Sequence, residues 1–290
     1  MSPTAYDPHA TFLSQQLLIH IMSNRRVAGM RDEKQVAFKW KTSFDRLASR
    51  WADFVDCPKR LKQLGPFIMK QLSPFDSPRV LDACMGIGCE TISLTSKGVD
   101  VVGNEISPQF RRIAAAEADR QDVDIRISSV DWRELVAEFG PEAFDAVLVL
   151  GNSLCLLRKR RDRLRAIENF GNICRPGGIV LVDERNFRYI LRNRRQIVLG
   201  KFRYSGRVMY CGTKVRGRPI HIGDDRVTFV YENCASGGPI GKLDMYPFRK
   251  GEIMELFRPA GFPRVDVYSD LERGYRDDAD FFTYVLRKSG

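Results

Sequence analysis

One stretch, residues 79–105 (RVLDACMGIGCETISLTSKGVDVVGNE), constrains the fold more than any other part of the chain. A short apolar run ends in Asp82, and a turn with Gly86 and Gly88 follows. A helical pattern comes next, and a second apolar run ends at Glu105. This order predicts a βαβ unit, with the glycine turn after the first strand and the acid after the second. Glycines let a ligand approach the backbone closely, and a carboxylate beside them can accept hydrogen bonds from both hydroxyls of a ribose.

The spacing of this turn argues against a dinucleotide. The NAD fingerprint G-x-G-x-x-G needs a third glycine inside the helix, but Glu90 and Thr91 occupy that region. The pattern from Asp82 to Gly88 is D-x-x-x-G-x-G, which resembles the first motif of S-adenosylmethionine-dependent methyltransferases with a doubly wound sheet. An ordinary strand-to-helix turn is the alternative, and Glu105 at the end of the next strand favours the methyltransferase hypothesis.

The remaining pattern predicts an α/β fold: a doubly wound, mostly parallel seven-stranded sheet, a small antiparallel β insertion and N-terminal helices. We divide the chain into a helical extension (1–40), a methyltransferase domain (41–195 and 250–290) and an antiparallel insertion (196–249). Apart from the βαβ unit, helices are expected at 43–54, 58–72, from 107 on, 162–174 and 251–257. Strands are expected at 124–128, 143–150, 179–182, 208–211, 227–231, 243–246, 265–268 and 281–286.

Polar residues follow several of the predicted strands. Asp131 and Trp132 come after the third strand and Asn152 after the run 143–150, while residues 183–186 (DERN) end the next strand. Ligands of open α/β sheets bind beyond the carboxyl ends of the strands, so we expect these residues to face one crevice. Asp131 and Trp132 could hold an adenine edge, or could be a capping acid and a packed indole.

Composition excludes several classes of function. The formal net charge is +11, with 47 Lys and Arg against 36 Asp and Glu, but these residues are spread and form no nucleic-acid motif. We therefore expect no nucleic-acid partner. Seven cysteines without a C-x-x-C pair, and only three His, predict no metal site and reduced thiols. The apolar residues 17–22 are too few to span a bilayer, so we expect a cytoplasmic protein without a membrane anchor.

Longer segments resemble the glycine and sarcosine N-methyltransferases. The resemblance covers roughly residues 44–288 and is most specific in LGNSLCLL and VDERNFRYIL, which are similar to the LGNSF and D-x-R-N-Y-D-x-I-L segments of that family. The other similar segments are WADFVDCPKRLKQLG (51–65), MYPFRK (245–250) and YRDDADFF (275–282). The resemblance implies an enzyme that uses S-adenosylmethionine, releases S-adenosylhomocysteine and methylates a small amine that carries a carboxylate.

The resemblance also implies roles for single residues. Arg60, ahead of the first strand, would bind the carboxylate of the cofactor, and Glu105 its ribose. Asn152 and Arg185 would hold the amino-acid substrate, with Arg185 as a bidentate clamp on its carboxylate; an ion pair of Arg185 with Asp183 or Glu184 is the alternative. The other expected cofactor contacts are Asp82, Ala83, Gly86, Gly88, Ile106, Asp131, Trp132 and Leu150, and the other expected substrate contacts are Tyr246 and Arg249.

Three positions depart from the family pattern. Phe44 and Phe187 each stand where the family has a Tyr, and Arg188 stands where it has an Asp. The added positive charge suggests a larger or more acidic substrate than glycine. The sequence thus predicts an N-methyltransferase of glycine, sarcosine or a related amino acid. The alternatives are a small-molecule O-methyltransferase, an RNA methyltransferase and a non-enzymatic binder of the cofactor; the number of methyl groups transferred and homo-oligomerisation are left open.

Overall fold

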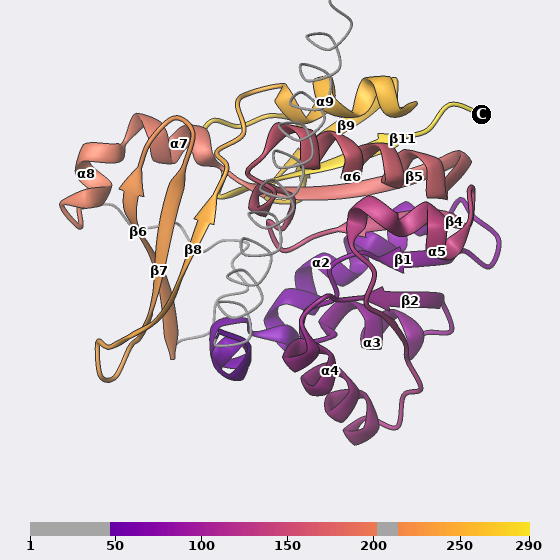
Figure 1. The fold of residues 1–290 in the computed structure, drawn as a ribbon, viewed down its shortest axis with the longest axis horizontal. Helices are drawn as coiled ribbons and strands as arrows, with labels where there is room; N and C mark the ends of the chain where they lie inside the picture. The colour runs from indigo at the N-terminus through magenta and orange to yellow at the C-terminus, as the bar shows by residue number, and fades with distance from the viewer. Residues whose placement is uncertain (1–46, 202–213) are drawn as a thin grey trace, which may run out of the picture. The chain divides into compact units, whose positions relative to one another are not determined.

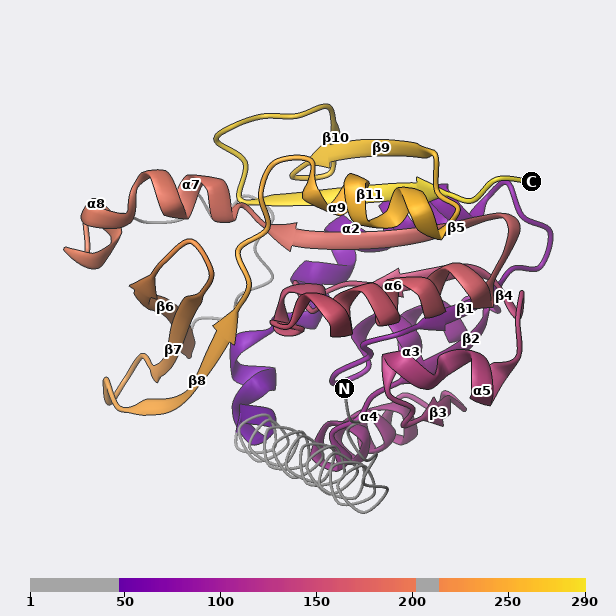
Figure 2. The same cartoon turned by 45° about the horizontal axis from the view of Figure 1, so that its top comes forward.

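The protein was analysed as a computed structural model that describes residues 47–201 and 214–290. The main sheet has the order β10-β9-β11-β5-β4-β1-β2-β3 (Figures 1 and 2). The pairs among β1 to β5 are parallel, whereas β11 runs antiparallel to both β5 and β9. The predicted seven-stranded sheet is present, and the two-residue β10 extends its edge. The strand bounds are β1 Arg79–Asp82, β2 Asp100–Asn104, β3 Arg126–Ser128, β4 Phe144–Val149, β5 Cys174–Arg185, β9 Arg264–Ser269, β10 Glu272–Arg273 and β11 Phe281–Arg287.

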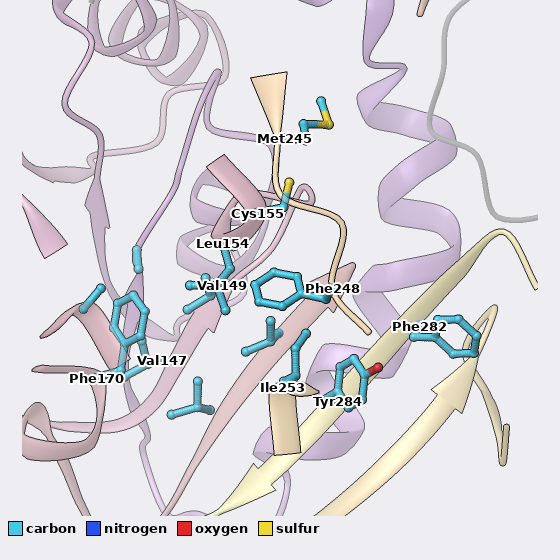
Figure 3. Packing of buried hydrophobic residues seen from close by; sticks show 14 of the residues in the cluster. Val147, Val149, Leu154, Cys155, Phe170, Met245, Phe248, Ile253, Phe282 and Tyr284 are labelled. Atoms are coloured by element: carbon cyan, nitrogen blue, oxygen red, sulfur yellow. The ribbon is translucent and has the colours of Figure 1, made fainter. Parts of the chain in front are cut away.

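Both faces of β4, in the middle of the sheet, are buried, as its continuous apolar run predicts. Ala146 and Leu148 of β4 pack in a cluster with α2, while Val147 and Val149 belong to the larger cluster with α6 and α9. Figure 3 shows part of this larger cluster. The helices of this domain are α2 Cys57–Leu72, α3 Cys89–Thr95, α4 Pro108–Arg120, α5 Leu135–Phe139, α6 Arg160–Ile173 and α9 Glu252–Phe257, with short 3-10 turns η1 Trp132–Glu134, η2 Leu154–Leu156 and η3 Arg258–Ala260.

The starts of two helices follow from local sequence. Asp56 caps α2 by accepting a hydrogen bond from the backbone N–H of Lys59, and Pro58 lies in the first turn as expected. Ser107 caps α4 in the same way, with Pro108 as its first residue. Residues 47–54 are also helical, within the range expected for the helix before α2. These caps fix where the chain enters the edge of the sheet that carries the glycine turn.

A second, three-stranded antiparallel sheet has the order β6-β7-β8 (Figure 1). Its strands are β6 Val215–Ile222, β7 Val227–Asn233 and β8 Pro239–Met245, and the helices α7 Phe187–Arg192 and α8 Arg194–Val198 precede it. Tyr246 N–H donates to the carbonyl of Cys155 at 2.7 Å, which ties the end of β8 to the loop after β4. The small sheet is therefore anchored next to the carboxyl edge of the main sheet.

The sequence prediction missed several elements. No helix was expected at α7 or α8, which are only six and five residues long. No strand was expected at β6, which contains Gly217 and Pro219. β5 begins earlier than expected: residues 175–178 bulge out between the pairs Phe144–Cys174 and Ala146–Ile179. The expected strand at 208–211 and the extension 1–40 lie outside the described residues.

The expectation of reduced thiols is wrong for two cysteines. Cys57 and Cys89 form a disulfide that joins the first residues of α2 and α3, with their Cα atoms 5.6 Å apart. No spacing motif links them, because they are 32 positions apart and meet only when the helices pack. Among the described residues, no helix is long and apolar enough to cross a membrane.

Candidate active site

The glycine turn after β1 contacts the acid after β2, as predicted. Gly86 and Gly88 have φ values of 58° and 87°, which glycine adopts without strain. The N–H of Gly86 donates to Glu105 Oε2 at 3.1 Å, and the N–H of Ser107 donates to Oε1 at 2.8 Å. Burial raises the pKa of Glu105, and these donors oppose that rise. The carboxylate is thus held beside the turn, in a position that suits the hydroxyls of a ribose.

Asp82 lies at the end of β1, deep in the molecule. Its carboxylate accepts a hydrogen bond from the hydroxyl of Thr91 at 2.8 Å. Burial, with the nearby charge of Glu90, raises the pKa of Asp82 to about 7. The carbonyl of the next residue, Ala83, accepts a hydrogen bond from Trp132 Nε1–H at 2.6 Å. Hydrogen bonds therefore fix Asp82 and Ala83 at the start of the glycine turn, and the indole of Trp132 is bound to Ala83.

Arg60 is buried rather than on the surface. It comes from the first turn of α2 and forms an ion pair with Glu90 of α3, whose side chain is also buried. The pair and the Cys57–Cys89 disulfide join the same two helix turns. In the sequence, Glu90 attracts notice only because it stands where a dinucleotide-binding turn would have a third glycine. Its position in the first turn of α3 is the signal that could have indicated a partner for an arginine. The role of Arg60 as a ligand of the cofactor carboxylate stays a prediction.

The residues expected at the adenine have structural contacts as well. Burial acts to raise the pKa of Asp131, but hydrogen bonds from Arg133 hold it below its usual value. Asp131 accepts the backbone N–H of Arg133 at 2.9 Å and pairs with its guanidinium at 2.7 Å. Trp132 also packs edge-on against Phe170. Ile106, beside Glu105, is 45% exposed. The capping and packing alternative describes these contacts, and a contact with adenine stays a prediction.

The end of β4 is joined to the glycine turn through Cys84. Its thiol donates to the carbonyl of Leu150 at 3.0 Å, and the N–H of Leu150 points back to the sulfur at 3.1 Å. The hydroxyl of Ser153 also donates to the carbonyl of Leu150, at 2.7 Å. Burial raises the pKa of the Cys84 thiol well above its usual value, which keeps it protonated as a donor. Leu150, one of the expected cofactor contacts, thus lies at the junction of β1 and β4.

Asn152 and Arg185 lie on the neighbouring ends of β4 and β5, as predicted. The side-chain oxygen of Asn152 accepts the backbone N–H of Arg185 at 2.9 Å, and its amide nitrogen lies 3.4 Å from the sulfur of Met245. Asn152 has φ 59°, a left-handed conformation that Asn tolerates better than most residues. Asp183 accepts the backbone N–H groups of Gly151 and Asn152. The two strand ends are therefore connected through side chains in both directions.

The guanidinium of Arg185 lies between aromatic rings of both sheets. Its Cζ atom is 5.1 Å from the ring centre of Phe229 on β7 and 4.9 Å from that of Phe281 on β11. The two acids proposed as alternative ion-pair partners have other contacts. Asp183 accepts the backbone N–H groups just described, and Glu184 pairs with Arg188 at 2.8 Å. The clamp for Arg185 stays a prediction.

Arg188 and Glu184 form a buried pair on the opposite face of β5. Glu184 also accepts a hydrogen bond from the hydroxyl of Tyr284 at 2.6 Å. Burial raises the pKa of Glu184 to about 7, although Arg188 acts against that rise. The guanidinium of Arg188 lies 4.3 Å from the ring centre of Phe282. The positive charge gained at Arg188 is therefore accompanied by an acid within the fold.

Tyr246 and Arg249, the other expected substrate contacts, gather around Glu252. The hydroxyl of Tyr246 donates to Glu252 at 2.8 Å, and its ring lies under the guanidinium of Arg163 at 3.6 Å. Arg249 is 3.8 Å from Glu252, and 83% of its side chain is exposed. No described contact brings either residue to Arg185, so their role at the substrate stays a prediction.

A continuous series of contacts links the strand ends along one edge. It runs from Glu105 to Gly86, from Cys84 to Leu150, and then from Asn152 to Asp183. Arg60 and Asp183 also line one small cavity, together with Phe281 and Thr283 of β11. Within residues 47–201 and 214–290, no cluster of His, Cys, Asp and Glu could hold a metal ion. This edge thus carries Glu105 as a candidate acceptor for ribose hydroxyls, and Arg60 and Arg185 as candidate ligands for carboxylates.

Comparisons with known proteins agree with this architecture. A methyltransferase domain family matches residues 80–178, the part that holds the glycine turn and the ends of β1, β2 and β4. The fold is similar to that of an S-adenosylmethionine-dependent methyltransferase from Clostridium acetobutylicum, with a TM-score of 0.63, 16% identity, and coverage of 79% of this chain and 92% of that one. Residues 80–178 are therefore a methyltransferase domain, and the chain has the fold of S-adenosylmethionine-dependent methyltransferases.

Sequence relatives define the family more closely. The glycine/sarcosine N-methyltransferase of Halorhodospira halochloris is 31% identical over 245 residues, which are 84% of this chain and 88% of that protein. The glycine/sarcosine N-methyltransferase of Parasynechococcus marenigrum is 33% identical over 239 residues, 82% of each chain. The glycine N-methyltransferase of Mus musculus is 29% identical over 147 residues, 47% of this chain and 50% of that one. The chain belongs to the glycine/sarcosine N-methyltransferase family.

Proposed function

We propose that this enzyme transfers the methyl group of S-adenosylmethionine to the amine of glycine, sarcosine or a related small amino acid. The observation that carries the proposal is the pairing of Asn152 with Arg185 at the ends of β4 and β5, on the edge that also holds Glu105. The named activity of the bacterial relatives supports the same substrate class.

The residues of the edge can bind and orient both molecules. When bound, S-adenosylmethionine supplies a methyl group activated by the sulfonium, so the protein needs no covalent nucleophile. Glu105 would hold the ribose and Arg60 the carboxylate of the cofactor. Arg185 would grip the carboxylate of the substrate, with Asn152 beside it, so that the neutral amine lies in line with the methyl group. The rings of Phe229 and Phe281 would limit the access of water to Arg185.

The pair of Glu184 and Arg188 bears on the choice of substrate. The sequence suggests a more acidic substrate because Arg188 adds a positive charge. In the structure Glu184 holds that arginine, so the added charge is offset locally. We therefore propose glycine or sarcosine first, and a dicarboxylic amino acid only as a comparison substrate.

The direct test is the release of S-adenosylhomocysteine with glycine, sarcosine, a dicarboxylic amino acid, a phenolic acceptor and RNA in separate reactions. The proposal expects turnover with glycine or sarcosine. Turnover confined to the phenol or to RNA would establish one of the alternatives, and cofactor binding by calorimetry without any turnover would indicate a non-enzymatic binder.

The variant Arg185→Lys tests the clamp. A lysine cannot form two parallel hydrogen bonds with a carboxylate, so the KM for the amine should rise much more than the Kd for the cofactor. Arg79→Lys, at the amino end of β1, is the matched control and should change neither. Equal effects of Arg185→Lys on both constants would contradict the assigned clamp.

The division of the chain also stays a proposal. We propose a methyltransferase domain of residues 41–195 and 250–290, an insertion of residues 196–249 close to the substrate and an extension of residues 1–40. The contact of Arg185 with Phe229 of β7 supports the place of the insertion. A cytoplasmic location stays a prediction, and the Cys57–Cys89 disulfide weakens the cysteine argument for it. Homo-oligomerisation stays open.

A further inference from the structure

Side chains connect the ends of β4 and β5 in both directions. From β5, Asp183 Oδ1 accepts the N–H of Asn152 at 2.6 Å, and Oδ2 accepts the N–H of Gly151 at 3.1 Å. From the loop after β4, the side-chain oxygen of Asn152 accepts the N–H of Arg185 at 2.9 Å. Each strand end thus positions the backbone of the other.

The Asp183 carboxylate is suited to this task by its two acceptor oxygens. Gly151 and Asn152 both have positive φ, 74° and 59°, and their successive N–H groups point to one place. A carboxylate can satisfy both groups, whereas an amide would present one N–H₂ to a donor. Asp183 is 4% exposed, so water does not replace these bonds easily.

Charges on other elements act on Asp183 as well. Burial raises its pKa, while Arg60 of α2 and the two backbone donors lower it, and Glu90 of α3 raises it. Arg60 and Asp183 line the same cavity. The buried carboxylate is therefore held by donors from β4 and by a positive charge from α2.

We propose that Asp183 is a positioning residue that fixes the substrate clamp: it holds the backbone of Gly151 and Asn152, and Asn152 in turn holds Arg185. The inference rests on the proposed function, because the clamp is the part of the site assigned to the amino-acid substrate. Asp183 itself need not touch the substrate.

The test compares Asp183→Asn with Asp145→Asn. Asp145 is also buried, lies on β4 and accepts a backbone N–H, that of Arg79 at 2.7 Å, but it lies at the amino end of the strand. Losing one charge-assisted bond should raise the KM for glycine or sarcosine about 10- to 100-fold in Asp183→Asn. The fold increase in the Kd for the cofactor should be at least about tenfold smaller than the fold increase in this KM. Asp145→Asn should leave both constants unchanged; an equal rise of KM in both variants would overturn the proposal.

Amide hydrogen exchange decides the inference even without turnover. The N–H of Arg185 bonds to Asn152 and not to Asp183, so its faster exchange in Asp183→Asn would show that the carboxylate acts through Asn152. Unchanged exchange at Arg185 in this variant overturns the proposal. If the wild type turns over no carboxylate-bearing amine, the proposed function fails, whereas the exchange result still decides the role of Asp183.

A double variant gives the last readout. Because Asp183 and Asn152 act as one unit in this account, Asn152→Ala combined with Asp183→Asn should raise the KM little beyond the larger single effect. If the KM of the double variant rises by the product of the two single fold increases, the two residues act separately, and the proposal is overturned.

Discussion

Reduction of the Cys57–Cys89 disulfide should lower the free energy of unfolding by up to about 3.7 kcal/mol. This figure is the loop-closure entropy of a 32-residue separation, which the cross-link removes from the unfolded chain. The measured loss is smaller where the unfolded chain retains structure, as engineered disulfides often show. The ion pair of Arg60 with Glu90 joins the same helix turns and should keep them together after reduction.

Urea unfolding with and without a reductant measures this effect. Cys57→Ser should unfold at lower urea than the wild type and should no longer respond to the reductant. Cys234→Ser, which changes an exposed free cysteine, is the control and should behave like the wild type. Alkylation of the denatured protein before and after reduction reports whether the bond is present. If the oxidised wild type and Cys57→Ser unfold at the same urea concentration, the reasoning is refuted.

Three further predictions concern single side chains. Glu184→Gln should flatten the pH dependence of the free energy of unfolding. Burial raises the pKa of Glu184 from 4.5 to about 7. The contribution of this carboxyl group to stability is therefore full below about pH 4.5 and is lost as the pH rises to about 7. Urea titrations at about pH 5 and about pH 7 measure this, and an equal loss in wild type and variant contradicts it. Arg60→Lys should raise the Kd for S-adenosylhomocysteine about tenfold by calorimetry, with an unchanged Kd counting against the assigned role. Phe170→Ala, which empties a fully buried position of α6, should cost about 3–5 kcal/mol in urea unfolding, and a loss below about 1 kcal/mol would show that the site collapses.

The βαβ unit and the strand ends could be predicted because local signals agree there. The apolar runs, the glycines and the caps Asp56 and Ser107 all act within a few residues of the elements they define. The direction of parallel strands then places Glu105, Asn152 and Arg185 on one edge. These parts of the site follow from chain order and topology, without knowledge of side-chain contacts.

The remaining features depend on contacts between distant segments. Glu90 meets Arg60, and Cys57 meets Cys89, only after α2 packs beside α3. Helices α7 and α8 are only six and five residues long, too short to show a helical period. Their buried residues are Phe187 and Ile190 in α7 and Ile197 in α8. Apart from the place of Glu90 in the first turn of α3, these contacts carry no signal in spacing or composition, and tertiary packing decides them.

The reciprocal bonds of Asp183 show a similar limit. The sequence places Asp183 two residues before Arg185, where an ion pair between them is a reasonable expectation. The positive φ of Gly151 and Asn152 turns two backbone donors toward the carboxylate instead. Only the backbone conformation of the loop reveals that this acid serves the neighbouring strand.

A crystal structure with S-adenosylhomocysteine and acetate, as a stand-in for the substrate carboxylate, tests the central claim most directly. The account predicts the ribose hydroxyls on Glu105 and the acetate on the guanidinium of Arg185, with the sulfur between them. Acetate bound elsewhere, or a cofactor whose sulfur faces away from Asn152 and Arg185, would contradict it.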